Sequence, residues 1–142
     1  MNNIYIVQCS KKKHNINEII AGELYNGDIF NKSVENILLK GASKKDIYII
    51  SSKYGIINYY DTIKNYDVYI SNLNKEELNQ LNELMNNQIQ KLNLNNKNII
   101  CYLSQNYLKK INFLKNFKYI NILPPKRLGY ILSYLKQLNK RN

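Results

Sequence analysis

The sequence predicts an α/β fold, with a single domain built as a three-layer sandwich around a mostly parallel, Rossmann-like sheet of four to five strands. Four short apolar segments alternate with segments of helical periodicity, and neighbouring parallel strands need helical crossovers of this kind. The chain has 142 residues, which suits one domain with one hydrophobic core, and neither a linker nor an internal repeat divides it. We therefore expect residues 1–142 to form one domain.

Each predicted strand is a short run of apolar and β-branched residues, which is the pattern of a strand buried on both faces of a sheet. The predicted strands comprise residues 4–8, 46–51, 98–103 and 119–123. Residues 52–67 follow the second of them and are rich in Tyr and Asn, and we expect them to form a long functional loop.

The helical segments show apolar residues three and four positions apart. We expect helices over residues 16–25, 29–40 and 107–114, a helix that starts at Asn74, and a final helix that carries Leu128, Ile131, Leu132, Leu135 and Leu138. Asn26-Gly27 separates the first two, and Gly41 is placed to cap the second at its carboxyl end. Asn74 and Glu77 have the spacing of a capping box, which marks a helix start.

The charge balance favours a polyanionic partner. Lys and Arg number 21 against 10 Asp and Glu, which gives a net charge of +11 and an isoelectric point near 9.6. Nucleic acid and anionic membrane surfaces are the partners that such a charge attracts. A coding bias towards lysine would produce the same excess without any partner, so both interpretations stay open at this point.

Cysteine usage and the first residues indicate a cytoplasmic protein. Cys9 and Cys101 are the only cysteines, and two thiols so far apart give neither a disulfide framework nor zinc-ligand spacing. The single histidine, His14, adds no metal motif. The apolar run at residues 4–7 is too short for a signal peptide, and no stretch is long enough to span a membrane. We expect no metal, no cofactor and no membrane partner.

Two polar segments follow the first two predicted strands. QCSKKKHN supplies Cys9, Ser10 and Lys12, and SSKYG supplies Ser51 and Lys53. Ligands of open parallel sheets bind at the carboxyl ends of the strands, where hydroxyl, ammonium and backbone N–H groups suit a phosphate or carboxylate. The sequence contains neither a Walker loop nor a dinucleotide-binding glycine motif. It therefore predicts an anion site made by both turns.

Two carboxylates lack a ready structural explanation. Glu23 lies in AGELYNG and Asp67 in NYDVYI, whereas Glu76 and Glu77 suit the start of a helix. A carboxylate in the cleft could stabilise or attack an oxocarbenium ion, as in glycosidic chemistry. The alternatives are a surface helix residue for Glu23 and a turn-capping residue for Asp67. Cys9 is either a nucleophile, whose thiolate form nearby lysines and a helix N-terminus favour, or a buried structural thiol.

Five segments, in order, resemble one protein family, the domain of unknown function DUF6884, which is found in bacteria and phages. They are QCSKKKHN, AGELYNGDIF, DIYIISSKYGII, IKNYDVYI and LPPKRLGYILSYLKQL. The family pattern is C-S-x-x-K, A-x-[DE]-L-Y-x-[SG]-x-[LI]-F, L-S-A-K-[YH]-G-L and P-Y-D, with a closing helix rich in Gly and Leu. The matching positions are Cys9, Ser10, Lys12, Glu23, Tyr25, Phe30, Ser51, Lys53, Gly55, Tyr66, Asp67 and Gly129. Ser52 replaces the usual Ala, and Asn65 replaces the Pro of P-Y-D, which is expected to loosen the turn before Asp67.

The resemblance implies chemistry on nucleobases. The C-S-x-x-K loop is similar to the Pro-Cys loop of the archaeosine synthase catalytic domain, which acts on a 7-deazaguanine base in tRNA. With the basic charge, this implies an enzyme that acts on a nucleobase or its N-glycosidic bond in a nucleotide or nucleic acid. Asp67, with Glu23 second, is then the catalytic carboxylate, and Cys9 is the alternative nucleophile.

The other matching residues are expected to bind the substrate. Ser10, Lys12, Ser51 and Lys53 would hold phosphates or base edges, and Tyr66 would orient the base or sugar. Tyr25 and Gly55 join this set through the family pattern. The tyrosines interleaved with lysines are expected either to stack on bases or simply to pack, and they are Tyr54, Tyr59, Tyr60, Tyr66 and Tyr69.

Two other functions stay open. The first is a non-catalytic nucleic-acid-binding protein, in which further basic residues extend the surface, namely Lys126, Arg127, Lys136, Lys140 and Arg141. The second is an interaction protein of phage type that blocks a host enzyme of nucleic-acid metabolism.

Overall fold

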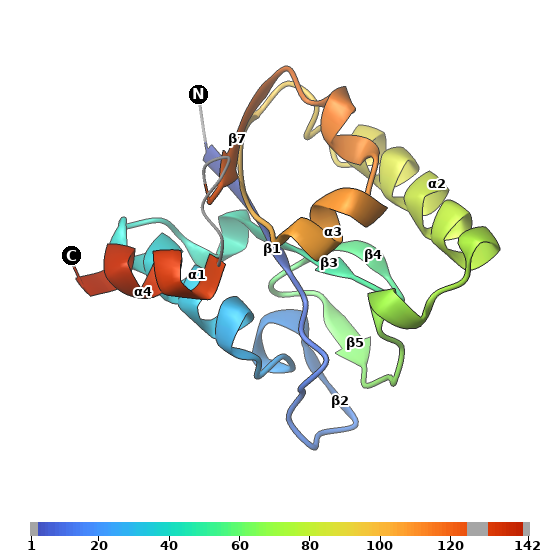
Figure 1. The fold of residues 1–142 in the computed structure, drawn as a ribbon, viewed down its shortest axis with the longest axis horizontal. Helices are drawn as coiled ribbons and strands as arrows, with labels where there is room; N and C mark the ends of the chain where they lie inside the picture. Colours follow the sequence, from blue (N-terminus) through green and yellow to red (C-terminus); the bar gives the residue numbers. More distant parts are fainter. Residues whose placement is uncertain (1–2, 125–130, 141–142) are drawn as a thin grey trace.

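A five-stranded, mostly parallel sheet forms the centre of the molecule (Figure 1). The computed structural model describes residues 3–124 and 131–140. Across the sheet the strands are β4 (Gly55–Asn58), β3 (Ile47–Ser51), β1 (Asn3–Gln8), β6 (Asn98–Tyr102) and β7 (Tyr119–Leu123). β3, β1, β6 and β7 are parallel, and β4 is antiparallel to β3 at one edge. The predicted α/β fold is confirmed, with five strands.

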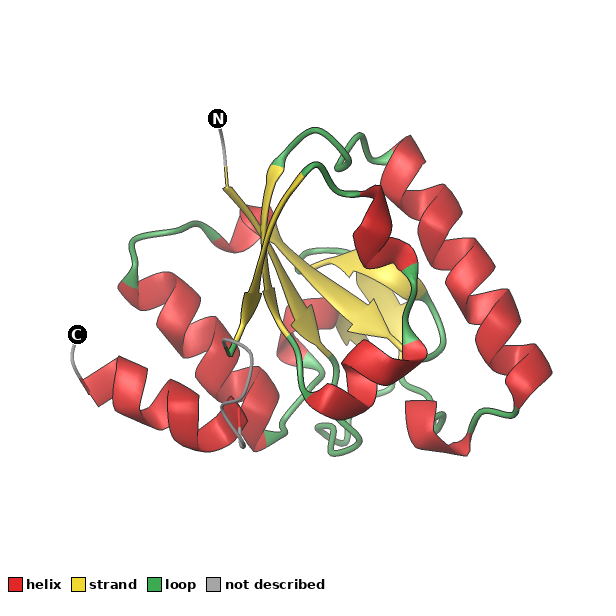
Figure 2. Cartoon of the chain, turned by 45° about the horizontal axis from the view of Figure 1, so that its top comes forward, coloured by secondary structure: helices red, strands yellow, loops and turns green. Residues whose placement is uncertain are grey.

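Helices cover both faces of the sheet, which gives three layers (Figure 2). They are α1 (Asp28–Leu39), α2 (Lys75–Lys91), α3 (Gln105–Lys110) and α4 (Ile131–Lys140). α1 and α4 pack against each other on one face, while α2, α3 and the 3-10 segment Phe113–Asn116 lie on the other. α1 lies on the opposite face from α2 and α3 because the chain crosses the sheet in one direction from β1 to β3 and in the other direction from β4 to β6 and β7.

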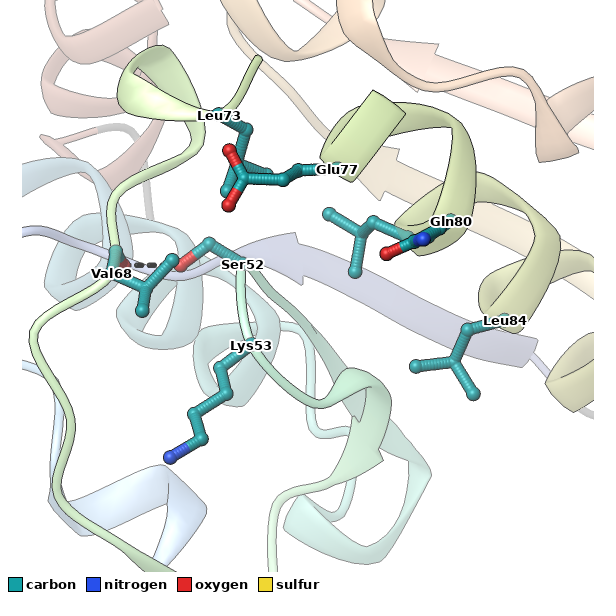
Figure 3. A pocket seen from close by; sticks show the side chains of 8 residues that line it. Ser52, Lys53, Val68, Leu73, Glu77, Gln80 and Leu84 are labelled. Atoms are coloured by element: carbon teal, nitrogen blue, oxygen red, sulfur yellow. Dashed lines mark hydrogen bonds between the residues drawn. The ribbon is translucent and has the colours of Figure 1, made fainter. Parts of the chain in front are cut away.

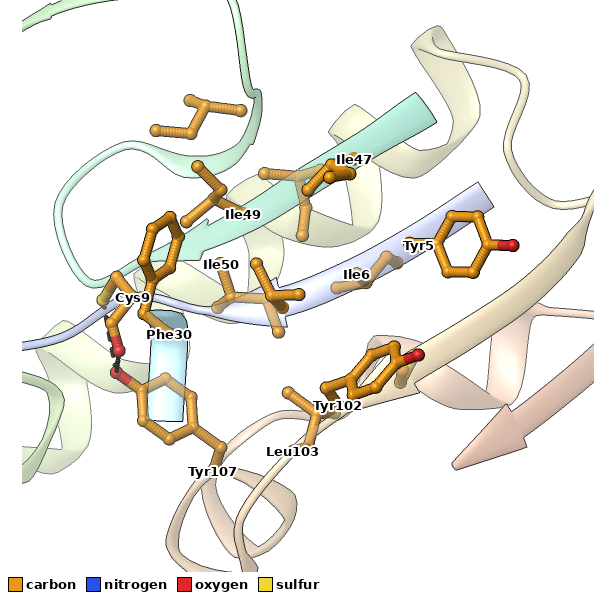
Figure 4. Packing of buried hydrophobic residues seen from close by; sticks show 14 of the residues in the cluster. Tyr5, Ile6, Cys9, Phe30, Ile47, Ile49, Ile50, Tyr102, Leu103 and Tyr107 are labelled. Atoms are coloured by element: carbon orange, nitrogen blue, oxygen red, sulfur yellow. Dashed lines mark hydrogen bonds between the residues drawn. The ribbon is translucent and has the colours of Figure 1, made fainter. Parts of the chain in front are cut away.

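The core lies between these layers, along the central strands (Figure 4). Five consecutive residues of β1 are buried, and Ile6, Ile49 and Cys101 are fully inaccessible. A parallel strand covered by helices on both faces has no side that tolerates polar residues, so its sequence reads as a continuous apolar run. That is why the central strands could be recognised from the sequence.

Two helix ends follow the predicted capping chemistry. The Glu77 N–H donates to Asn74 Oδ1 at 2.8 Å, and the Asn74 N–H donates to Glu77 Oε1 at 2.9 Å, which completes the capping box of α2. Gly41, with a φ of +83°, follows the end of α1, and its N–H donates to the Leu38 carbonyl. Both caps are confirmed.

The helix expected over residues 16–25 is wrong. This segment contains the three-residue strand β2 (Glu18–Ile20) and a 3-10 turn, Ala21–Glu23. β2 pairs antiparallel with β5 (Thr62–Lys64), and the Gly22 N–H donates to the Tyr59 carbonyl at 2.8 Å. Pairing with a distant segment outweighs the weak helical spacing, because β-branched Ile19 and Ile20 favour a strand once a partner is available.

The long loop expected over residues 52–67 is also wrong, since it contains β4 and β5. A turn of three residues joins β3 to β4, which is too short for a crossover and therefore forces an antiparallel hairpin. Gly55 has a φ of +76° at this turn, where a side chain would also meet Gln88. The predicted helix over residues 107–114 is divided between α3 and the 3-10 segment that follows it.

The final helix is confirmed as α4, in which Ile131 and Leu135 are buried. Leu128 and Gly129, together with Lys126, Arg127 and Arg141 of the predicted basic surface, lie outside the described residues. Among the helices of the described part, none has both the length and the apolar character that a membrane crossing needs.

Candidate functional site

The polar turns that follow β1 and β3 lie at the same edge of the sheet. β1 and β3 are parallel neighbours, with Gln8 opposite Ile50. The Cys9 N–H continues this pairing by donating to the Ile50 carbonyl at 3.0 Å. Ser51 is therefore next to the start of the Cys9–Ser10 loop, because both chains leave the sheet in the same direction.

Ser51 organises the turn between β3 and β4. Its Oγ accepts the backbone N–H of Lys53 at 3.2 Å and that of Tyr54 at 2.9 Å. The side chain is fully buried, so these bonds replace the water that the turn's N–H groups would otherwise contact. Ser51 thus has a structural role in this turn as well as its place in the predicted site.

A chain of hydroxyl groups continues from Ser51. Tyr66 Oη lies 2.9 Å from Ser51 Oγ and 2.5 Å from Tyr25 Oη, and Tyr25 is only 2% exposed. Burial raises the pKa of both tyrosines, and the Cys9 thiol nearby raises it further. At neutral pH both phenols are therefore protonated and act as hydrogen-bond donors and acceptors rather than as bases.

A hollow opens where the direction of strand order changes. From β1 the chain proceeds to β3 on one side and later to β6 on the other, and ligands of such sheets bind at this point. We call it the switch-point hollow; it measures about 300 Å³, and its lining includes Cys9, Ser10, Lys11, Lys12, Tyr69 and Tyr107. Its volume is at the lower end of the range for small-molecule sites.

Cys9 lines this hollow beside the phenol of Tyr107. The two groups are joined by a hydrogen bond with 3.2 Å between Cys9 Sγ and Tyr107 Oη (Figure 4). Tyr107 belongs to α3, directly after β6, so the pair connects the carboxyl ends of two neighbouring strands. Burial raises the pKa of Tyr107, and the Cys9 thiol adds to the effect. The phenol therefore stays protonated at neutral pH, and its hydroxyl also donates to the Cys9 carbonyl at 3.4 Å.

Lysines surround these tyrosines. Lys13 Nζ lies 4.5 Å from the centre of the Tyr66 ring, and Lys11 Nζ lies 5.8 Å from that of Tyr69. Lys12 is exposed and lines the switch-point hollow. Ammonium groups over aromatic rings place positive charge next to flat apolar surfaces. A nucleotide-binding site combines these two features, because cations attract the phosphate and rings stack on the base.

The loop after β1 is fixed at its base by α1. The Gly27 N–H donates to Ser10 Oγ at 3.1 Å, and Ser10 Oγ donates to the Lys12 carbonyl at 2.6 Å. A Cβ on Gly27 would lie 2.4 Å from that of Ser10, so this close approach requires glycine. The Ser10 hydroxyl is thus occupied in shaping the loop.

Asn65 anchors the same loop from the other side. Its Nδ2 donates to the carbonyls of His14 at 3.1 Å and Ile16 at 2.9 Å, and its Oδ1 accepts the Tyr66 N–H at 2.8 Å. The sequence predicts a looser turn where Asn65 replaces proline. In this protein three side-chain hydrogen bonds of Asn65 hold the turn in place of the proline.

The two candidate carboxylates lie apart from this group. Glu23 Oε1 accepts the hydroxyl of Tyr59, and the Tyr59 N–H pairs with Ile47, the first residue of β3, whereas Ser51 is the last. Asp67 follows Tyr66 and is exposed, and it makes no hydrogen bond or ion pair with any described residue. The structure therefore gathers Cys9, Tyr25, Ser51 and Tyr66 but leaves Glu23 outside their contacts.

A second hollow of about 290 Å³ lies between α2 and the turn after β3 (Figure 3). Ser52 Oγ donates to the Val68 carbonyl at its edge, and Gln80 and Leu84 of α2 form its other wall. Lys53 extends away from that wall in Figure 3, and its Nζ lies 5.4 Å from the Tyr54 ring centre. The lining of the switch-point hollow includes none of the predicted site residues at and after the end of β3, namely Ser51, Lys53, Tyr54 and Gly55.

Three residues of the site were missed from the sequence. Tyr107 has no motif around it, and a signal existed only in its place directly after the predicted strand 98–103. Gly27 was treated as a helix separator, although it also permits the contact with Ser10. Lys11, which lines the hollow, could have been found as part of the same lysine run as Lys12.

The described residues contain no group of three His, Cys, Asp or Glu side chains placed to bind a metal ion. No curated protein matches the chain. A sequence model of one family, described as a family of unknown function (DUF6884), matches residues 4–137. This match covers nearly the whole chain and includes every residue of the switch-point hollow, and the protein therefore belongs to the DUF6884 family.

Proposed function

We propose that the protein is an enzyme that acts on a nucleobase or on its N-glycosidic bond, in a nucleotide or a nucleic acid, and that the switch-point hollow is its active site. The observation that carries the proposal is the lining of this hollow: a basic loop, two phenol rings and a thiol face one space at the strand ends. A nucleotide needs a cationic surface for its phosphate and flat apolar surfaces for its base. The hollow supplies both.

The roles follow from position. Lys11 and Lys12 attract the phosphate, and the rings of Tyr69 and Tyr107 flank the base. Cys9 is the nucleophile within the hollow and reacts as the thiolate, and the hydroxyl of Tyr107 stabilises that thiolate by donating a hydrogen bond to the sulfur. Asp67 follows Tyr66 in the chain but does not line the hollow, so its proposed part, the stabilisation of positive charge on the sugar as the bond to the base breaks, depends on the Asp67→Asn result.

The surrounding charge supports a polyanionic substrate. Among the described residues there is one ion pair, Lys32 with Glu35, so most of the lysine excess is not neutralised within the protein. Cys9 and Cys101 are both free thiols, which fits a reducing compartment such as the cytoplasm. The same uncompensated charge favours the second candidate, a nucleic-acid-binding protein without catalysis.

The test is turnover measured by mass spectrometry of released or altered bases. The protein is incubated with nucleosides, nucleotides, and modified DNA and RNA oligonucleotides. Cys9→Ser and Asp67→Asn are expected to abolish turnover while oligonucleotide affinity is kept, or raised for Asp67→Asn because a negative charge is removed. Glu23→Gln is the matched control, since it removes the same charge from a carboxylate held at Tyr59.

Two results would reject the proposal. Loss of turnover in Glu23→Gln with full activity in Cys9→Ser and Asp67→Asn would place the chemistry elsewhere. Tight, salt-dependent oligonucleotide binding without turnover of any substrate class would favour the binding protein instead.

A further inference from the structure

We propose that the substrate is a single-stranded polynucleotide whose backbone runs from the switch-point hollow along a groove between α1 and α4. This inference rests on the proposed function and names its substrate class. The groove holds a third hollow of about 260 Å³, lined by Lys32, Glu35, Lys136, Asn139 and Lys140. We call this the α1–α4 groove.

The groove leads away from the switch-point hollow. Asp28 and Ile29 at the start of α1, and Leu132 at the start of α4, line the switch-point hollow. Lys32 lies four residues after Asp28, and Lys136 lies four residues after Leu132. Residues four apart share one face of a helix, so the two hollows follow one another along the same faces of α1 and α4.

Side-chain hydrogen bonds fix the two helices side by side (Figures 1 and 2). Asn36 Nδ2 donates to Asn139 Oδ1 at 2.9 Å, and Asn139 Nδ2 donates to the Lys32 carbonyl at 3.2 Å. Tyr102 of β6 donates to Asn36 Oδ1 at 2.6 Å from beneath. Asp28 and Leu132, near the starts of the two helices, line one hollow, and Asn36 contacts Asn139 further along both. α1 and α4 therefore run in the same direction. The hydrogen bonds between them hold the groove in a fixed shape.

The charges along the groove suit a row of phosphates. Lys32 is paired with Glu35 at 3.0 Å, whereas Lys136 and Lys140 form no ion pair with any described residue. Like charges four residues apart on a helix repel each other, and a bound phosphate removes that repulsion. The groove therefore carries a net positive charge even with Glu35 included.

The spacing favours a strand over a single nucleotide. Each four-residue step along a helix advances about 6 Å, so the lysines of the groove lie one or two steps beyond the hollow. A mononucleotide in the switch-point hollow carries no phosphate that far along the helices, whereas the next nucleotides of a strand do. The groove is a single basic surface, so it can contact the phosphates of one strand, and we therefore propose a single-stranded substrate rather than a duplex.

The experiment compares ligands of increasing length. Affinities for thymidine monophosphate, a thymidine dinucleotide and an oligothymidylate octanucleotide are measured by calorimetry or fluorescence anisotropy at several salt concentrations. The wild-type protein is expected to bind the octanucleotide much more tightly than the mononucleotide. In Lys136→Gln/Lys140→Gln the octanucleotide affinity is expected to fall on the order of tenfold, and the salt slope by about 1.4 for two lost single-strand contacts. Mononucleotide affinity stays the same.

Lys75→Gln/Lys91→Gln is the matched control. It removes the same charge from two exposed lysines of α2, on the opposite face of the sheet, and Gln keeps the helix propensity of Lys. This variant is expected to lower octanucleotide affinity only slightly, through the change in overall charge. An equal loss of octanucleotide affinity in both double variants would overturn the proposal that the strand lies in the α1–α4 groove, because it would show a general effect of charge.

The outcomes separate this inference from the proposed function. If nucleotides are turned over but the octanucleotide binds no more tightly than the mononucleotide, the groove fails and the proposed function stands. If octanucleotide affinity depends on Lys136 and Lys140 while no substrate class is turned over, the proposed enzymatic function fails. The α1–α4 groove then stands as a nucleic-acid-binding surface.

Discussion

The hydroxyl of Ser51 lies 2.9 Å from that of Tyr66, and geometry decides which of them donates. A serine hydroxyl has one hydrogen and two lone pairs. The N–H groups of Lys53 and Tyr54 occupy both lone pairs, so the Ser51 hydrogen is donated to Tyr66. The Tyr66 hydrogen is then free to be donated to Tyr25. The buried chain therefore has a direction that starts at the turn after β3.

Ser51→Ala is expected to lower the free energy of unfolding by about 1–3 kcal/mol, because it leaves two turn N–H groups without an acceptor and removes the hydrogen bond that Tyr66 accepts. Urea denaturation measures the effect. Ser43→Ala is the control, since Ser43 Oγ accepts only one exposed N–H at 3.4 Å, and a change within about 0.5 kcal/mol is expected there. A double-mutant cycle with Tyr66→Phe should give a coupling of about 1 kcal/mol, and additive effects would contradict the direct bond.

Gly27→Ala is expected to disturb the site and the fold together. The new Cβ would meet the Cβ of Ser10 at 2.4 Å, and neither atom can rotate away, so the loop after β1 must move relative to α1. We expect a loss of about 1–3 kcal/mol in stability and weaker nucleotide binding. The measurements are urea denaturation and a nucleotide titration.

Gly41→Ala provides the comparison for Gly27. Gly41 has a φ of +83° and no atom within 4 Å of a new Cβ, so alanine there is strained but meets nothing. A loss of about 1 kcal/mol in stability with unchanged nucleotide affinity is expected. Unchanged affinity in Gly27→Ala as well would separate the Ser10 loop from the binding site.

Stability is expected to fall at alkaline pH because of the buried tyrosines. Burial, followed by the charge of Glu23, raises the pKa of Tyr59 to about 12, and burial also raises the pKa of Tyr25, Tyr66 and Tyr102. Above about pH 10 the unfolded chain releases phenol protons that the folded protein keeps, so the unfolded state gains stability as pH rises. The contribution is fully present below the unfolded pKa.

Absorbance of the phenolate ion, measured together with unfolding, tests this expectation. Tyr25, Tyr59, Tyr66 and Tyr102 should titrate only above the usual range of tyrosine, or abruptly when the protein unfolds. All thirteen tyrosines titrating together near pH 10 in the folded protein would contradict the burial of the chain.

The sequence identified what local patterns encode. Strands such as β1 and β6 were visible because burial on both faces leaves a continuous apolar run, and Asn74 marked α2 through its own capping bonds. β2 and β5 were missed because each has three residues, and their pairing of Glu18 with Lys64 joins distant parts of the chain. No local spacing reports such a partner.

The site shows the same division. The parallel pairing expected of β1 and β3 placed the turns at Ser10 and Ser51 at one edge of the sheet, although Ser51 does not line the switch-point hollow. It did not show that Tyr107 would meet Cys9, since these residues are 98 positions apart and only the β1–β6 pairing brings them together. Nor did it show that Glu23 would be bound to Tyr59 at the other end of β3.

The two cysteines are expected to differ in reactivity. Cys9 is 4% exposed and lines the switch-point hollow, whereas Cys101 is inaccessible in β6 and burial raises the pKa of its thiol. The thiolate is the reactive form, and each unit by which a pKa is raised removes about tenfold of it at neutral pH. A thiol-alkylating reagent should therefore modify Cys9 at least on the order of tenfold faster than Cys101.

Peptide mapping by mass spectrometry measures both rates, with Cys9→Ser and Cys101→Ser assigning the modified positions. A nucleotide in the switch-point hollow should slow the reaction at Cys9 and leave Cys101 unchanged, because only Cys9 lines that hollow. Equal rates at both positions would show that modification occurs through unfolding rather than through the hollow. Fast modification of Cys9 that no nucleotide slows would show that the hollow admits small molecules but does not bind nucleotides.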